Sequence, residues 1–274
     1  MELEFWGVRG SAPVSGRRQV KFGGHTPCAS LKSSSGGLLI VDAGTGIMRL
    51  GERVMAGSGK TAIELNVLLT HFHLDHIIGL PFFAPLYSSR AAIVFHSPVD
   101  PKETEKYLAG LQMGRYFPVS FRETASRKKI LKANESGFEV GGFRVSCCPL
   151  NHPQGSVAYR IEEGGGSVVF ATDTEPPDGG MDERLASFIR GAACFVYDAT
   201  FTLREYRVRQ GWGHSTWLEG TRLARAGGVR NLVLSHFNPD HDDSRVAGLV
   251  RQARKEFRRT FAAREGWKVR VEHE

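Results

Sequence analysis

The stretch that decides the fold is ELNVLLTHFHLDHIIGL, residues 64–80. An apolar, β-prone run ends at Thr70, and an apolar, helix-like segment follows over residues 77–80. Between them lie four side chains of the kinds that bind divalent metals: His71, His73, Asp75 and His76. A lone histidine is usually structural, but four such groups directly after an apolar strand are hard to explain by packing. We interpret the stretch as part of a two-metal hydrolytic centre.

Such a centre needs further donors, and three polar side chains each follow another apolar, strand-like run. They are His152, Asp173 and His236. Because α/β proteins place their chemistry at the carboxyl ends of strands, we expect these residues to join the first four. A carboxylate has two oxygens and can bridge two ions. The predicted ligand set is therefore His71, His73 and His152 for one metal and Asp75, His76 and His236 for the other, with Asp173 bridging both.

Composition places the chain among ordinary globular proteins. It has 274 residues, of which 41% are hydrophobic and 24% charged, and it contains no low-complexity linker. We predict a single domain over residues 1–274. The formal charge of +7 favours anionic partners. The four cysteines match no zinc-binding spacing, the first residues lack a signal-peptide pattern, and no apolar run approaches the ~20 residues that span a bilayer. We therefore expect reduced thiols, a cytoplasmic location and no membrane contact.

The order of predicted elements indicates two packed sheets. Strands lead the chain, beginning with residues 3–6 and a hairpin of Cys28–Lys32 and Leu38–Val41, and helices fall between later groups of strands. One later group is predicted to be antiparallel: residues 128–131, Phe138–Val140 and residues 143–147. A long helix is predicted over residues 242–259. The pattern favours two mixed sheets with helices on the outside.

The His-x-His-x-Asp-His pattern and the later His, Asp and His together resemble the metallo-β-lactamase fold superfamily, from Asp42 to His236. The resemblance implies an α/β fold, an αββα four-layer sandwich of two mixed β-sheets flanked by helices. It also implies two divalent metal ions, zinc first and manganese or iron as alternatives, and is compatible with a homodimer. The same kind of site serves lactams, thioesters and phosphodiesters, so the motif alone does not select the substrate.

Two later segments resemble the tRNase Z-like phosphodiesterase branch of that superfamily: YDATF, residues 197–201, and GHST, residues 213–216. The resemblance implies an acid–histidine pair beside the metals, here Asp198 and His214, with aspartate in place of the more usual glutamate. Bacterial tRNase Z enzymes usually insert a long tRNA-binding arm between the ligand histidine and the bridging aspartate. Here residues 152–173 hold only a predicted hairpin, so the chain is similar to the smaller, cyclic-phosphate phosphodiesterases of the branch.

These features predict a dinuclear-metal-dependent hydrolase that cleaves a cyclic nucleotide or other small phosphodiester through a metal-bridging hydroxide. His214, held by Asp198, would protonate the leaving oxygen, and Asp75 would orient the hydroxide as well as bind metal. The expected partner is a small anionic phosphodiester, with nucleic acid as a second choice. The alternatives are a ribonuclease or single-stranded DNA nuclease, and a thioester or lactam hydrolase. The candidate substrate contacts are His25, two tryptophans and seven cations: Trp212, Trp217, Arg9, Arg17, Arg18, Lys21, Arg204, Arg207 and Arg209.

Overall fold

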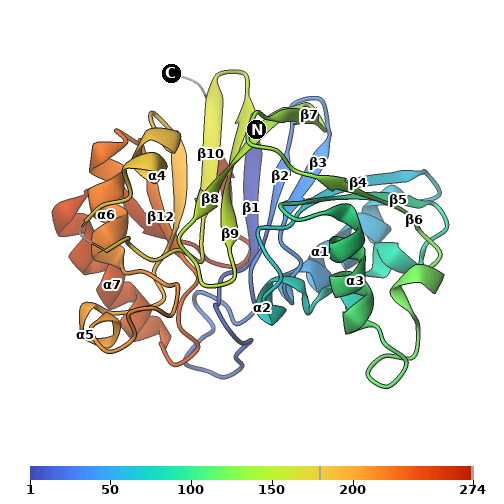
Figure 1. The fold of residues 1–274 in the computed structure, drawn as a ribbon, viewed down its shortest axis with the longest axis horizontal. Coiled ribbons are helices and arrows are strands. Elements are labelled where there is room, and N and C mark those ends of the chain that lie inside the picture. Colours follow the sequence, from blue (N-terminus) through green and yellow to red (C-terminus); the bar gives the residue numbers. More distant parts are fainter. Residues whose placement is uncertain (179, 273–274) are drawn as a thin grey trace.

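The computed structural model describes residues 1–178 and 180–272, and it contains two seven-stranded sheets packed face to face (Figure 1). The first sheet has the strand order β14-β1-β2-β3-β4-β5-β6. Its strands are β1 (Glu2–Gly7), β2 (Cys28–Lys32), β3 (Leu38–Val41), β4 (Ile63–Leu68), β5 (Ala91–Ser97), β6 (Arg127–Lys132) and β14 (Lys268–Arg270). Strands β3 to β6 are mutually parallel, whereas β14, β1, β2 and β3 pair in antiparallel fashion.

The second sheet has the order β13-β12-β11-β10-β9-β8-β7. Its strands are β7 (Phe138–Val140), β8 (Phe143–Leu150), β9 (Ser156–Glu163), β10 (Gly166–Ala171), β11 (Cys194–Asp198), β12 (Leu232–Ser235) and β13 (Thr260–Ala262). Strands β10 to β13 are parallel, and β7 to β10 are antiparallel. Both sheets are therefore mixed, as predicted.

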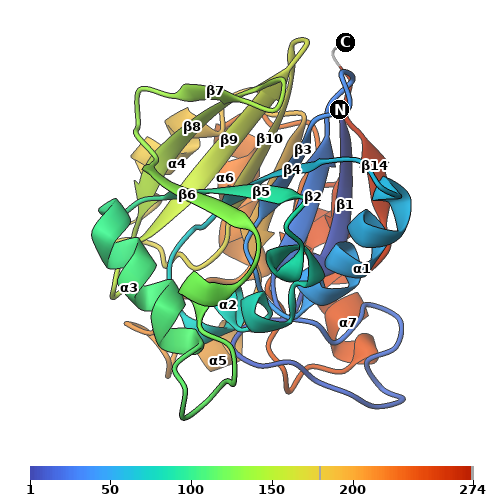
Figure 2. The same cartoon turned by 90° about the vertical axis from the view of Figure 1, so that its right-hand side faces the viewer.

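Helices cover the outer face of each sheet. Figure 2 shows the side on which α1 (Gly46–Ser58), α2 (Leu74–Ile77) and α3 (Pro101–Leu111) lie over the first sheet. On the opposite side in Figure 1, α4 (Glu183–Phe188), α6 (Trp217–Ala226) and α7 (Asp243–Glu256) lie over the second sheet, with α5 (Leu203–Tyr206) below them. Short 3₁₀ turns occupy Leu80–Phe82, Ala84–Tyr87 and Phe121–Glu123. This is the predicted αββα sandwich.

The alternation of side chains along each strand builds two apolar cores. Leu39 and Val41 of β3 point into the larger cluster, which fills the space between the sheets and continues under α6 and α7. Ile40, between them, belongs to the second cluster, which lies between the first sheet and its helices. Burying each such side chain fully stabilises the fold by about 1.5–3 kcal/mol. The four cysteines are buried and free, as expected for reduced thiols.

Strand β6 differs from the prediction. It pairs in parallel with β5 in the first sheet and does not pair with β7. The reason is the helix α3 between β5 and β6, because a strand–helix–strand crossover makes its two strands parallel. The chain then crosses to the second sheet before β7. The predicted long helix is also shorter, since α7 ends at Glu256 and the chain forms the three-residue strand β13.

His96 on β5 yields a prediction about acid stability. Its ring is buried and stacks on Phe138, with centroids 4.8 Å apart. Burial, aided by Lys129, lowers the pKa of His96 from 6.5 to about 4. The unfolded chain therefore binds a proton at higher pH than the folded chain, and stability is lost as pH falls from 6.5 toward 4. Between pH 6.5 and pH 5 the free energy of unfolding falls by roughly 2 kcal/mol because of this one histidine.

We expect a His96→Phe protein to lose less unfolding free energy than the parent when urea titrations at pH 7 and pH 5 are compared. The phenyl ring keeps the stacking contact and takes up no proton. If both proteins lose the same free energy over this interval, the buried histidine is not the acid-sensitive group.

Candidate metal centre

The seven predicted ligands lie together at one end of the sandwich, opposite the N-terminus in Figure 1, where α2 begins. They come from both sheets, because β4, β8, β10 and β12 all end at this edge. Ligand atoms lie within 4.8 Å of one another in three groups: His71, His73, His152 and Asp173; Asp75, His76 and His236; and Asp173, Asp198, His214 and His236. The first two groups hold the residues of the two expected sets, with Asp173 placed in the first.

Asp173 lies between the two groups. Its Oδ2 is 3.1 Å from Nε2 of His76 and 3.3 Å from Nε2 of His236, while its Oδ1 is 3.7 Å from Nε2 of His71. Each oxygen therefore faces a different group, as a bridging carboxylate requires. The Nε2 atoms of His76 and His236 are only 3.2 Å apart, and each also faces Oδ2 of Asp75.

Three buried atoms at this point have no hydrogen-bond partner in the described part of the chain: Nε2 of His71 and both carboxylate oxygens of Asp173. Buried polar atoms are nearly always paired, because leaving one unpaired costs about 1–3 kcal/mol. Imidazole nitrogen and carboxylate oxygen are donor atoms that zinc takes in proteins. The unpaired Nε2 of His71 lies 3.7 Å from the unpaired Oδ1 of Asp173. The donor set therefore fits divalent metal ions.

The outer nitrogen of each histidine is fixed by a partner, which leaves the other nitrogen directed inward. His73 is held through Nε2 by Oε1 of Gln154 at 2.8 Å, so its Nδ1 faces inward, 3.1 Å from Nε2 of His152. The other four are held through Nδ1: His71 by Thr70 at 3.1 Å, His76 by Asp42 at 2.8 Å, His152 by the Gly213 carbonyl at 2.9 Å and His236 by Thr200 at 2.9 Å.

Asp42 is the main residue that the sequence prediction missed. Its carboxylate accepts from the backbone and hydroxyl of Thr70 and from His76. Asp42 directly follows the apolar strand β3, as Asp173 follows β10, and this shared position was the available signal. Asp42, Asp173 and His236 also share a left-handed backbone, with φ of 62°, 59° and 58°. That conformation is uncommon for non-glycine residues and is typical of functional sites.

At His71 and Asp173, electrostatics favour the protonation states that metal binding needs. Burial, and then the neighbouring His76, hold the pKa of His71 well below 6.5, so this imidazole stays neutral. Burial alone would raise the pKa of Asp173, but His236, His76 and His71 outweigh it and hold this pKa well below 3.8. A neutral imidazole beside an ionised carboxylate is the form in which both side chains coordinate cations.

Asp198 and His214 form a pair at the edge of the cluster. Nδ1 of His214 lies 3.1 Å from Oδ2 of Asp198, so the shorter aspartate spans the distance. Asp198 is fully buried and also accepts from the backbone of Asp173, Thr200 and Ser215. Burial lowers the pKa of His214, but Asp198 outweighs it, and the pKa rises to about 9. Nε2 of His214 has no hydrogen bond to the described residues and remains free to donate.

One predicted substrate contact is wrong. The Arg9 side chain is fully buried, and its guanidinium donates to the carbonyls of Gly23 and His241 at 2.8 and 2.6 Å. Arg9 therefore ties the N-terminal loop to the chain after β12 and cannot reach substrate. Arg18 is exposed and pairs with Asp242, and His25 contacts Thr45. Arg17 is exposed.

The loop that Arg9 secures touches the metal centre directly. The backbone N–H of Ser11 donates to Oδ2 of Asp75 at 2.7 Å. Gly10 lies against the His236 ring, and a Cβ added at Gly10 would be 2.3 Å from two ring atoms. That ring is buried and held by Thr200, so it has no room to move away.

We therefore expect Gly10→Ala to displace His236 and to weaken metal affinity and hydrolysis by about 10–100-fold, the range seen when support for a ligand is lost. Titration with a fluorescent zinc chelator would measure the affinity. Gly57→Ala is the matched control, because a Cβ at Gly57 in α1 meets nothing within 4 Å. Equal metal affinity in the two variants would show that Gly10 has no such role.

The family model for the beta-lactamase superfamily domain matches residues 39–237. A curated relative, ribonuclease Z of Bradyrhizobium sp. (strain ORS 278), is 25% identical and aligns over 91% of this chain and 94% of its own. Among solved structures, the metallo-beta-lactamase fold protein YhfI from Bacillus subtilis has a TM-score of 0.73 at 20% identity and covers 98% of both chains. A diphosphatase from the PhnP family has a TM-score of 0.67 at 17% identity, covering 99% of this chain and 98% of its own.

The chain belongs to the beta-lactamase superfamily domain family. It is a metal-dependent hydrolase of the metallo-β-lactamase fold, which confirms the class expected from the sequence. Within the described part of the chain, no helix combines the length and the apolar character that crossing a membrane requires.

Proposed function

We propose that this hydrolase is a phosphodiesterase that acts on a cyclic nucleotide or another small phosphodiester. The observation that carries the proposal is the Asp198–His214 pair next to Asp173, with Nδ1 of His214 also 3.8 Å from Oδ1 of Asp173. Thioester hydrolysis expels a thiolate, which needs less help from an acid than an alkoxide leaving a phosphodiester. A histidine that is hydrogen-bonded to a buried carboxylate and faces the cluster supports the phosphodiester reaction.

We infer that the ions are held by the seven predicted ligands and that they are zinc, with manganese or iron as alternatives. The proposed holders are His71, His73 and His152 for one ion, Asp75, His76 and His236 for the other, and Asp173 for both. When bound, such a pair of ions supplies positive charge for the phosphoryl oxygens and lowers the pKa of water. Because both sheets contribute holders, we take residues 1–274 as one catalytic domain.

The protein side chains would contribute orientation and a proton. A hydroxide, formed when water releases one proton to the solvent, would form a bond to phosphorus while the bond from phosphorus to the leaving oxygen breaks, and Nε2 of His214 would give its proton to that oxygen. Asp198 keeps the imidazole in place through Nδ1 and stabilises its charge. Asp75, fixed by the Ser11 N–H, has an oxygen directed at the cluster and would orient the attacking water.

A cation and two aromatic rings border His214 and are suited to a nucleotide substrate. The Phe201 ring lies 5.7 Å from the His214 ring, and the Arg209 guanidinium lies 5.5 Å from Phe201 and 5.8 Å from Trp212. Trp212 is 61% exposed, so its ring is available to stack on a base, whereas Trp217 is buried. Arg209 would then balance the charge of the phosphodiester.

The segment between His152 and Asp173 supports a small substrate. It holds β9, a tight turn at Gly164 and Gly165, and β10, and these strands pair from Gly166–Glu163 onward. This short hairpin supports a small substrate over a tRNA gripped by an arm at that position. A ribonuclease is the second candidate, because curated relatives named ribonuclease Z align over nearly the whole chain.

The test uses purified protein loaded with zinc or with manganese. It is assayed on a chromogenic phosphodiester, cyclic AMP, a short single-stranded RNA, a lactam and a thioester. We expect cleavage of the first two and little of the last two. Faster cleavage of RNA than of cyclic AMP would select the ribonuclease. Intact phosphodiesters alongside a cleaved lactam or thioester would overturn the proposal.

A further inference from the structure

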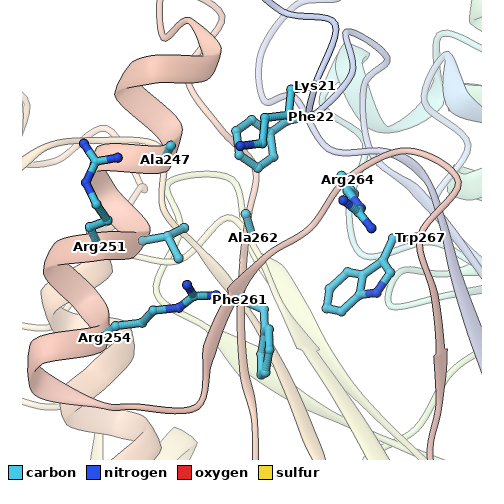
Figure 3. A pocket seen from close by; sticks show the side chains of 10 residues that line it. Lys21, Phe22, Ala247, Arg251, Arg254, Phe261, Ala262, Arg264 and Trp267 are labelled. Carbon is cyan, nitrogen blue, oxygen red and sulfur yellow. The ribbon is translucent and has the colours of Figure 1, made fainter.

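A second candidate binding site lies on the flank of the molecule, in a cavity of about 480 Å³. Figure 3 shows it between α7, strand β13, the loop at Phe22 and the turn that carries Trp267. None of the residues that line it belongs to the metal centre. Its contact with that centre is indirect, since the Phe22 ring lies 6.1 Å from Phe237, the residue after His236.

The lining carries four cations and no carboxylate: Lys21, Arg251, Arg254 and Arg264. The nearby acids are engaged elsewhere. Asp243 accepts from the backbone of Lys21 and Phe22, and Glu265 accepts from the backbone of His25 and pairs with Arg49. Among the described residues, none of the four cations forms an ion pair. Unbalanced positive charge around a concave surface attracts anions.

Aromatic rings form another part of the wall. Phe261 and Trp267 are half-buried, and their rings are 5.9 Å apart and tilted by 41°. In Figure 3 the Arg254 side chain extends toward Phe261, and its guanidinium is 5.8 Å from that ring. Arg264 lies beside Trp267 on the other side of the cavity. Cations and partly exposed rings that share one concave surface suit a ligand with both a negative charge and a planar ring.

We propose that this cavity binds a nucleotide unit, with its phosphate on the arginines and its base against Phe261 and Trp267. An apolar peptide would leave four cations without a counterion, and inorganic phosphate would leave the rings unused. A free nucleotide and a nucleotide within an RNA chain present the same chemistry. The site is independent of the reaction proposed for the metal centre.

The test is a calorimetric titration of the metal-loaded protein with AMP, adenosine, inorganic phosphate and a short single-stranded RNA. We expect AMP to bind about tenfold more tightly than adenosine or phosphate, because it uses both the arginines and the rings. Tighter binding of the RNA than of AMP, if it is weakened by substitution of Arg254 and Arg264, would also support the site and would assign its ligand to a nucleic-acid strand.

The double variant Arg254→Gln/Arg264→Gln should weaken AMP binding about tenfold. The matched control Arg144→Gln/Arg258→Gln removes the same charge from exposed residues outside the cavity and should leave binding within about twofold. Both proteins should keep full hydrolysis of a chromogenic phosphodiester, so a failed binding site is distinguishable from a failed phosphodiesterase. Equal weakening in both doubles, no weakening in either, or phosphate binding as tight as AMP would overturn the proposal.

Discussion

An Asp173→Asn protein is expected to bind at most one metal ion tightly and to lose about 10³-fold or more in kcat on a phosphodiester. Asp173 is fully buried, both of its carboxylate oxygens lack hydrogen-bond partners among the described residues, and each oxygen faces one of the two ligand groups. Asparagine keeps the size of the side chain but removes its charge and replaces one oxygen by an amino group. Metal content by mass spectrometry and kcat on a chromogenic phosphodiester are the two measurements.

The backbone of Asp173 is held independently of its carboxylate, because its N–H donates to Asp198 and its carbonyl accepts from Ser156. The variant should therefore fold, and circular dichroism would verify this. Asp240→Asn, an exposed aspartate close to His236 in the chain, is the matched control and should keep two ions and full activity. Two tightly bound ions in Asp173→Asn would contradict the bridging role.

A His214→Ala protein is expected to keep both ions yet lose about 10²–10⁴-fold in kcat on a cyclic nucleotide, the usual contribution of a general acid. Metal content is decisive here, since nitrogen and oxygen atoms of His214, Asp198, Asp173 and His236 also lie within 4.8 Å of one another. Loss of an ion together with activity would make His214 a metal ligand and would contradict its role as an acid.

Asp198→Asn separates orientation from proton donation. The amide cannot stabilise the charged imidazolium, so His214 should remain in place with a lower pKa and a smaller loss of kcat than in His214→Ala. Asp198 also accepts hydrogen bonds from three backbone N–H groups. The thermal stability of the Asp198→Asn protein must therefore be measured together with its activity.

The sequence was most informative where a histidine or an aspartate comes directly after an apolar strand. The fold brings together the cluster of His71 to His76 and the later positions His152, Asp173 and His236, and their metal-binding role stays a prediction. The physical reason is that parallel strands bring their carboxyl ends to one edge, so polar residues after those strands must meet. The same reasoning could have found Asp42, which follows β3.

Other features depend on contacts between distant segments and have no local signal. Arg9 lies in a glycine-rich loop, which suggests an exposed side chain. It is nevertheless buried, and the carbonyls of Gly23 and His241 accept hydrogen bonds from its guanidinium. The basic side chains of residues 251–259 are exposed, and the fold additionally places Arg251 and Arg254 around a cavity with Lys21 from the opposite end of the chain. Such pairings appear only when β13 and β14 take their places in the sheets.

The most direct measurement compares two phosphodiesters that differ in leaving group, each assayed with the parent protein and with His214→Ala. One releases p-nitrophenolate, which needs no proton to depart, and the other is a cyclic nucleotide, whose alkoxide does. If His214 protonates the leaving oxygen, the variant should lose about 10²-fold or more in kcat/KM on the cyclic nucleotide and far less on the p-nitrophenyl ester. An equal loss on both substrates would contradict the proposed role of the Asp198–His214 pair.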